Sequence, residues 1–223
     1  MSKIQLCDSL QTFPLFQGMG HGDMMQIVAR TKFDFLKLSA NEKLIREGEC
    51  CKALYLLLNG MISVETSSND GNYTITEFLE APQVICFDSI FGITGYYRSN
   101  VYSTTDVALM AISRRDIVSM IGTYPIIRMN AMNMLAISYH KVQKRIWSHE
   151  TSGIRERITN FIHLRLQYPA GHKLVKIHME RLAEEVGDSR LNVSRALNAM
   201  KKEGLVMLSR GMINIPKFEA LLK

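Results

Sequence analysis

The 223-residue sequence lacks several features that would place it in a class at once. No apolar run approaches the roughly 20 residues that a membrane-spanning helix needs, so we expect no membrane segment. The first residues contain no apolar core followed by a small-residue cleavage site, so we expect no signal peptide. The four cysteines, Cys7, Cys50, Cys51 and Cys86, form no dense disulfide framework, which favours a reduced, cytoplasmic setting.

Histidine is absent between Phe33 and Thr123. Metal enzymes built on a barrel of strands need two or three histidines and a carboxylate that converge inside the barrel, so we expect no enzyme of that kind. An iron–sulfur cluster is not expected either, because such clusters need four ligands and the adjacent cysteines 50–51 would point to opposite faces of a strand. Haem stays open as a cofactor, because axial ligands could come from methionines or from His21, His140 and His149.

Charge is modest in amount and uneven in position. Hydrophobic residues make up 47% and charged residues 22% of the chain, which is typical of one or two folded domains with real cores. Residues 1–149 carry 14 Lys/Arg and 13 Asp/Glu, whereas residues 150–223 carry 13 and 8, a net of +5. Nearly all of the +6 excess therefore lies in the last third. A local basic excess favours a polyanionic partner, although many solvated helices are also basic.

The first half of the chain predicts short helices and then short strands. Residues 10–32 read as helices, and from Phe33 to Ser113 the segments are short, rich in Val, Ile, Leu and Tyr, and cut by turn residues. ALYLLLNGMISVET predicts a hairpin around Asn59-Gly60, and SSNDGNYTITEFL predicts a second one around Asp70-Gly71. STTDVALMAIS predicts a further strand. Short strands at this spacing indicate a β-sandwich or barrel.

A long helix is predicted from Pro125 to about His149, because proline is well tolerated in a first helical turn and no glycine interrupts the segment. One side of this helix repeats at alternating spacings of four and three, a heptad-like seam formed by Arg128, Met132, Leu135, Tyr139, Val142 and Ile146. The seam fits either a helix packed on its own domain or a helix that pairs with its twin in a dimer. The length of the helix favours the dimer.

The last third predicts helices followed by a small hairpin. Residues 154–166 are amphipathic, and HMERLAEEVGDSRLNVSRALNAMKKEG predicts helix, turn and helix. Gly187 permits the tight turn, Asp188 or Ser189 can cap the second helix, and Gly204 ends it. GLVMLSRGMINI predicts two short strands around Ser209-Arg210-Gly211, and FEALLK a short terminal helix. This order, on a basic segment, is typical of a winged helix.

The start of the second helix carries an unusual set of outward side chains. Its predicted buried stripe is Val193, Leu197 and Met200, with Leu182, Ala183 and Val186 inside the first helix. The outward or flanking faces then hold Arg190, Leu191, Asn192, Ser194 and Arg195. In a DNA-binding helix-turn-helix these turns meet base edges in the major groove. An ordinary helical hairpin with a solvated face is the alternative, and the wing, the local charge and the long helix favour DNA.

Two passages resemble the Crp/Fnr family of transcription regulators, and the likeness extends over nearly the whole chain. LIREGECCKALYLLLNGMISV is similar to the family's Gly-Glu strand pair, and HMERLAEEVGDSRLNVSRALNAMKKEGLV is similar to its helix-turn-helix. The resemblance implies an α+β protein: a cyclic-nucleotide-binding-like β-roll (a double-stranded β-helix, or jelly roll) at 1–123, a dimerisation helix at 124–149 and a winged helix-turn-helix at 150–223. It implies a cytoplasmic homodimer that binds double-stranded DNA, with RNA polymerase as a further partner.

The resemblance also implies roles for residues of the second helix. Arg190 and Arg195 match the family's two base-reading arginines, whereas Leu191 stands where well-known members carry glutamate. Readout of cytosine through a carboxylate is therefore lost, and Leu191 could touch a thymine methyl group instead. Ser189 and Asn192 match positions that contact phosphate, and Arg210 in the wing is a further candidate phosphate contact.

An effector site is implied by the stretch CFDSIFGITGYYRSNVYS. Arg98-Ser99 matches the pair that holds the cyclic phosphate in members that bind cyclic AMP, and Asp88 stands where those members carry glutamate. Phe87 replaces the preceding glycine, and Val142 and Gln143 replace the Thr-Ser that reaches the adenine. These departures disfavour cyclic AMP and leave another anion or an organic effector open. The structural alternative is that Arg98 is an ordinary loop arginine without a ligand. A haem- or gas-sensing regulator of the same architecture stays open. The helix-turn-helix and wing argue against a cyclic-nucleotide-binding regulatory subunit without DNA function.

Overall fold

The computed structural model describes residues 3–91, 95–147 and 153–222, without the side chains of residues 141–147. Its contacts divide the chain into two compact units. Unit 1 comprises residues 1–62 and 80–139, and unit 2 comprises residues 63–79 and 140–223. The segment 63–79 therefore groups with the C-terminal residues, although it lies within the predicted β-roll.

Unit 1 opens with short helices; the prediction of helices over 10–32 is confirmed, and a further helix lies almost entirely before that range. They are α1 (Lys3–Gln11), the 3-10 helix η1 (Pro14–Phe16) and α2 (His21–Arg30). Their apolar side chains turn inward, and Leu10, Phe13 and Phe16 are fully buried.

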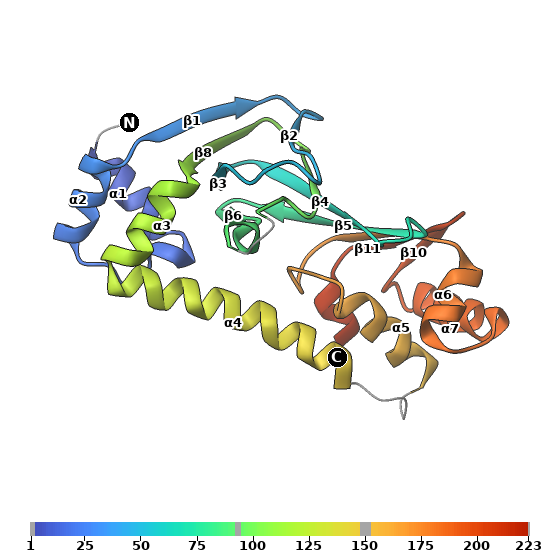
Figure 1. Cartoon of the computed structure of the whole chain (residues 1–223). Helices are drawn as coiled ribbons and strands as arrows, with labels where there is room; N and C mark the ends of the chain where they lie inside the picture. The colour runs from blue at the N-terminus through green and yellow to red at the C-terminus, as the bar shows by residue number, and fades with distance from the viewer. Residues whose placement is uncertain (1–2, 92–94, 148–152, 223) are drawn as a thin grey trace. The chain divides into compact units, whose positions relative to one another are not determined.

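A four-stranded antiparallel sheet forms the centre of unit 1 (Figure 1). Its order is β1-β8-β3-β6, with β1 (Phe33–Leu38), β8 (Val107–Ser113), β3 (Ala53–Asn59) and β6 (Gln83–Ile85). A further antiparallel pair joins β2 (Lys43–Ile45) to β7 (Asn100–Ser103). The 3-10 helix η2 (Phe87–Ile90) follows β6. The predicted α+β class with an N-terminal roll of antiparallel strands is confirmed.

The hairpin predicted around Asn59-Gly60 is wrong. Strand β3 pairs with β8 and β6, whereas the next strand, β4 (Met61–Ser67), lies beside β5 in another sheet. The chain changes sheets at Gly60. Its φ of 89° is a positive value that glycine adopts readily and other residues rarely adopt. A Cβ there would lie 2.5 Å from the carbonyl oxygen of Asp106. The Asn-Gly pair thus marks a crossing where two backbones approach closely, which the dipeptide alone does not distinguish from a hairpin turn.

The predicted hairpin around Asp70-Gly71 is confirmed. It joins β4 to β5 (Tyr73–Glu80), and the Ser68 amide donates to the Tyr73 carbonyl at 2.9 Å. The Asp70 carboxylate accepts from the Ser68 hydroxyl at 2.7 Å and from the Asn72 side-chain amide at 2.6 Å. These bonds lower the pKa of Asp70 to about 2, the Ser68 hydrogen bond contributing most.

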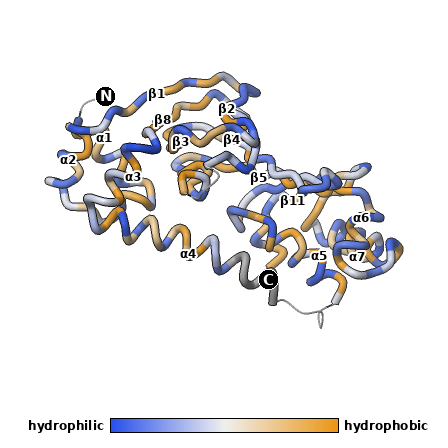
Figure 2. Tube along the Cα trace, in the orientation of Figure 1, coloured by the Kyte–Doolittle hydropathy of each residue, from blue (hydrophilic) through white to orange (hydrophobic). Residues whose placement is uncertain are grey.

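Two helices follow the strands of unit 1. Helix α3 (Arg114–Thr123) begins at Ser113, whose hydroxyl accepts from the Asp116 amide, and α4 (Pro125–Trp147) follows after one residue. The predicted long helix is confirmed to Trp147, and residues 148–149 lie outside the described part. Figure 2 shows apolar and hydrophilic residues alternating along α4. Ile127 and Ala131 are the buried residues on one side of this helix.

Unit 2 contains a winged helix-turn-helix. Its elements are α5 (Ile154–His163), β9 (Lys173–Ile177), α6 (Met179–Val186), α7 (Arg190–Lys202), β10 (Met207–Ser209), β11 (Met212–Ile215) and the 3-10 helix η3 (Phe218–Leu222). Strands β10, β11 and β9 are antiparallel neighbours, and β5 pairs along the other edge of β9. The helices cover one apolar core that includes Ile158, Val175, Leu197 and Ile215. No helix in the described residues is long and apolar enough to cross a membrane.

Candidate nucleic-acid interface

The turn between α6 and α7 has the geometry that its sequence predicts. Gly187 ends α6 with φ 63° and ψ 43°, the left-handed conformation in which glycine is favoured. The Asp188 amide then donates to the Ala183 carbonyl at 3.0 Å, which closes the end of α6. The two helices are thereby joined by a short, fully hydrogen-bonded turn.

Two polar residues of this turn prepare the start of α7. The Ser189 hydroxyl caps the helix by accepting from the Asn192 amide at 3.2 Å. The Asp188 carboxylate accepts from the Asn192 side-chain amide at 2.8 Å and forms an ion pair with Arg157 of α5. The hydrogen bond from Asn192, the largest contribution, and the nearby Arg157 guanidinium lower the pKa of Asp188. The first turn of α7 is therefore held from both α5 and the turn.

Helix α7 separates a buried face from an exposed one, as predicted. Val193, Leu197 and Met200 are at most 1% exposed. The exposed side chains of the first two turns are Arg190, Leu191, Asn192 and Arg195, with Ser194 half-buried beside them. Leu191 is 59% exposed, so its apolar side chain is open to a partner.

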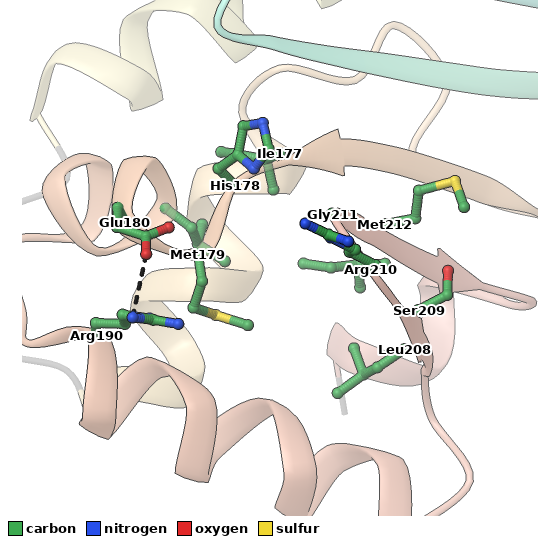
Figure 3. Close-up of a pocket in the computed structure, with 12 residues that line it drawn as sticks. Ile177, His178, Met179, Glu180, Arg190, Leu208, Ser209, Arg210, Gly211 and Met212 are labelled. Atoms are coloured by element: carbon green, nitrogen blue, oxygen red, sulfur yellow. Dashed lines mark ion pairs between the residues drawn. The ribbon is translucent and has the colours of Figure 1, made fainter.

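The wing places a further cation near the start of α7. Arg210 is exposed at the tip between β10 and β11. A hollow of about 300 Å³ separates the wing from α6 and the first residue of α7, and Glu180, Arg190 and Arg210 are among its lining residues. Figure 3 shows Glu180 and Arg190 facing each other on one side of this hollow and Arg210 on the other. Glu180 and Arg190 form an ion pair, with Arg190 Nη1 3.2 Å from Glu180 Oε1.

The residues predicted to bind DNA thus lie within one face of unit 2. Ser189 to Arg195 belong to one helix start, and Arg210 lies across the hollow. Long hydrogen-bonding side chains at a helix start suit the edges of bases, and an exposed wing arginine suits phosphate. The sequence reasoning did not find Glu180 as part of this face, and a helix-turn-helix pattern contains no signal for it.

The residues of the predicted effector site differ in exposure. Arg98 is exposed, Asp88 is half-buried, and Ser99 is fully buried. Phe87 is 7% exposed and packs edge-on against Phe91, with ring centroids 5.4 Å apart. The side chains of Val142 and Gln143 lie outside the described residues.

The predicted seam residues of α4 are partly exposed. Met132 and Tyr139 are 57% and 59% exposed, Arg128 is exposed and Leu135 is half-buried. The side chains of Val142 and Ile146 lie outside the described residues. Met132 lies about 140° around the helix from the buried Ile127, because each residue turns an α-helix by about 100°.

The candidate ligands for metal or haem lie apart in the chain. His21 and His140 are exposed, and His149 lies outside the described residues. Cys50 is exposed, whereas Cys7, Cys51 and Cys86 are buried, and burial raises the pKa of the Cys7 and Cys51 thiols. Among residues 3–91, 95–147 and 153–222, no group of three or more His, Cys, Asp or Glu is arranged to hold a metal ion.

A second polar centre was missed because it joins distant segments. Glu77 of β5 lies directly opposite Lys173 of β9, with Oε2 and Nζ 3.6 Å apart, and the two side chains are 2% and 0% exposed. Strand β9 itself was not predicted. The burial of this strand alternates, with Lys173, Val175 and Ile177 inside, but its sequence does not alternate between polar and apolar residues, because the buried Lys173 is charged and Leu174 and Val175 are adjacent.

Comparisons with known proteins match two parts of the chain, and the first match includes the segment 63–79 that groups with unit 2. Residues 35–124 match the family profile of the cyclic nucleotide-binding domain, and residues 156–223 match that of the Crp-like helix-turn-helix domain. The cyclic AMP receptor protein of Thermus thermophilus is 23% identical over 202 residues, which cover 91% of this chain and 92% of the relative.

Two solved structures share the fold. The sensor domain of the transcriptional regulator DNR from Pseudomonas aeruginosa is 17% identical, with a TM-score of 0.56 over 68% of this chain and 98% of that one. A putative transcriptional regulator from Eubacterium rectale, described as of the crp/fnr family, is 19% identical, with a TM-score of 0.51 over 94% of this chain and 96% of that one.

Proposed function

Because the chain belongs to the Crp/Fnr family of transcription regulators, we propose that it binds double-stranded DNA sequence-specifically as a homodimer. One observation carries the proposal. The start of α7 exposes Arg190, Leu191, Asn192 and Arg195 while the same helix buries Val193, Leu197 and Met200. A helix that presents such side chains is suited to the major groove of DNA. A cytoplasmic location is proposed with this function, because the protein must reach DNA.

Each side chain of this face has a distinct proposed role. Arg190 and Arg195 contact guanine edges, because a guanidinium can bind O6 and N7 together. Leu191 contacts a thymine methyl group, in place of a carboxylate that would read cytosine. Contacts to phosphate come from Ser189, Asn192, Ser194 and Arg210, which fix the register without reading sequence.

The dimer is proposed to form along α4. Met132 and Tyr139 present large apolar surface outward, and a twin helix would cover it. A two-fold dimer then directs its two recognition helices to successive major grooves about 34–36 Å apart, on a near-palindromic site. RNA polymerase is the proposed second partner at a promoter.

The β-roll is proposed to sense a small effector. Arg98 is an exposed cation, which suits an anion or an organic acid, and Ser99, its neighbour in the sequence, is fully buried. The relative named a cyclic AMP receptor protein shares the domain, but the buried Phe87 takes space at a position where a nucleotide site needs glycine. Haem or a gas bound through haem is the alternative. In either case effector binding would act through α4 on the spacing of the recognition helices.

The test of DNA binding is a salt titration. The full-length chain is mixed with random double-stranded DNA, bound sequences are selected, and the affinity for the selected site is measured by fluorescence anisotropy at several salt concentrations. We expect the logarithm of the binding constant to fall by about 0.9 per phosphate neutralised per tenfold rise in salt. A salt-independent affinity, or no selected sequence, would contradict the proposal. Native mass spectrometry of the same protein reports the dimer and any bound effector.

A further inference from the structure

The start of the recognition helix contains two arginines in different electrostatic settings. Arg190 Nη1 lies 3.2 Å from Glu180 Oε1, and Glu180 comes from the first turn of α6 (Figure 3). No ion pair within the described residues holds Arg195, which is exposed one helical turn further along α7. The two arginines therefore offer an internal comparison of a guanidinium held by a carboxylate with one that is not.

The ion pair leaves the reading edge of Arg190 open. A guanidinium has five N–H donors in a rigid fork, and Glu180 takes one of them, at Nη1. The donors at Nη2 and Nε remain, and two parallel donors are what guanine O6 and N7 accept. A carboxylate at Nη1 thus fixes the plane of the fork without occupying the edge that reads a base.

The same carboxylate disfavours the competing contact. The side chains of Arg190 and Glu180 are 69% and 60% exposed, so the pair is weak while both side chains face water. An arginine without restraint can rotate from the base edge to the nearest phosphate, and a phosphate contact carries no sequence information. The negative charge of Glu180 repels phosphate and attracts Arg190, and both effects strengthen when DNA excludes water from the hollow.

We propose that Glu180 is a specificity-determining positioning residue, which holds the Arg190 fork toward one base pair and away from the DNA backbone. The inference rests on the proposed function, since it concerns how the same face reads DNA. Glu180 lowers the affinity for DNA in general and raises the discrimination at the base pair that Arg190 contacts.

The experiment compares two variants of α6 that each replace a glutamate by the uncharged glutamine. Glu180→Gln removes the carboxylate beside Arg190, whereas Glu184→Gln removes a carboxylate that bonds Arg181 at 3.2 Å instead. Both variants change the net charge equally. The full-length proteins are titrated with a library in which each base pair of the selected site is varied singly, and Arg190→Ala and Arg195→Ala identify the base pair that each arginine reads.

A bidentate arginine discriminates between bases by roughly 5- to 150-fold, and we expect Glu180→Gln to reduce this preference at least about threefold at the Arg190 base pair alone. Binding to random DNA should strengthen, and its salt slope should steepen by up to about 0.9 as Arg190 gains a phosphate. Preference at the Arg195 base pair should stay unchanged. Glu184→Gln should strengthen binding evenly over all sequences.

Three results would overturn the inference. Preferences in Glu180→Gln that equal those in Glu184→Gln at every base pair would show that Glu180 acts only through its net charge. A sharper preference at the Arg190 base pair would show that Glu180 draws Arg190 away from DNA. Loss of preference at all base pairs would show that Glu180 holds the fold, and the thermal melting of each variant identifies that case. If the wild-type chain selects no sequence at all, the proposed function fails first.

Discussion

Two of the ion pairs in unit 2 have opposite surroundings. Glu77 and Lys173 join β5 to β9 and are almost completely buried, whereas Glu180 and Arg190 join α6 to α7 and are more than half exposed. The Glu77 carboxylate also accepts from the Gln167 and Tyr168 amides, both at 2.8 Å, and Lys173 donates to the Ala170 carbonyl at 2.6 Å. The buried pair is part of a network of hydrogen bonds to the backbone, while the exposed pair has hydrogen-bonding capacity left for a partner.

The difference separates charges that hold the fold from charges that meet DNA. Removing a buried charge from water is costly unless it is paired and hydrogen-bonded, so a buried pair is fixed once formed. An exposed pair contributes little to stability and can reorganise when a polyanion arrives. Mutation of the first should therefore change folding, and mutation of the second should change binding.

The largest expected effect comes from Glu77→Leu. This change leaves the Lys173 ammonium buried without its carboxylate and removes the acceptor of two backbone amides, so we expect unfolding to become easier by about 3–5 kcal/mol. Lys173→Met should cost less, because Glu77 keeps both amide donors. The free energy of unfolding from chemical denaturation, measured for both single variants and the double variant, gives the coupling between the two charges.

The control is a partly exposed pair that joins β9 to β4. Lys176 Nζ and Glu65 Oε2 are 4.0 Å apart, with side chains 52% and 29% exposed. Glu65→Gln should change the stability by less than about 1 kcal/mol. Equal effects of Glu77→Leu and Glu65→Gln would contradict the burial of the Glu77–Lys173 pair.

A smaller effect, on binding rather than folding, is expected for Arg190→Ala. Loss of the guanidinium should weaken binding to the best site by about 1–3 kcal/mol and relax the preference at one base pair. Its melting temperature should stay near that of the wild type, because the Arg190 side chain is 69% exposed. Anisotropy on the selected site and on random DNA separates the two cases: equal losses on both would mean that Arg190 contacts only phosphate.

The sequence predicted the recognition face better than the pairing of β5 with β9, for a physical reason. The turn at Gly187, the cap at Ser189 and the stripe of Val193, Leu197 and Met200 are local features, set by residues within about four positions of one another. Each was predicted correctly from its spacing.

The pairing of β5 with β9 brings together residues that are far apart in the chain. Glu77 and Lys173 are neighbours only because β5 pairs with β9, and nothing in either segment alone specifies the other. The Asn59-Gly60 pair shows the same limit, since its turn geometry depends on Asp106 across the fold. The roles of the DNA-facing and effector residues remain predictions, because they concern partners rather than contacts within the chain.

The smallest expected effect tests the loop that begins β5. The folded pKa of Asp70 is about 2, below its ordinary value of 3.8, so the ionised carboxylate stabilises the folded state. That contribution is complete above the ordinary value and is lost as the pH falls from 3.8 through about 2. Asp70→Asn should therefore be less stable than wild type at neutral pH, by an amount that shrinks once the pH drops below 3.8.

Ser68→Ala sharpens this last test, because the Ser68 hydroxyl makes the largest contribution to the low pKa of Asp70. The variant keeps the carboxylate but removes its 2.7 Å donor, so the Asp70 pKa, followed by NMR of its side-chain carbonyl carbon, should rise toward 3.8. The acid limb of the stability curve should then move to higher pH than in wild type. An Asp70 pKa that does not move in Ser68→Ala would show that the bonds from Asn72 and the charge of Arg181, 3.1 Å away, hold the carboxylate instead. The pH dependence of this loop would then belong to Asn72 and to the contact with α6, and not to the Ser68 hydroxyl.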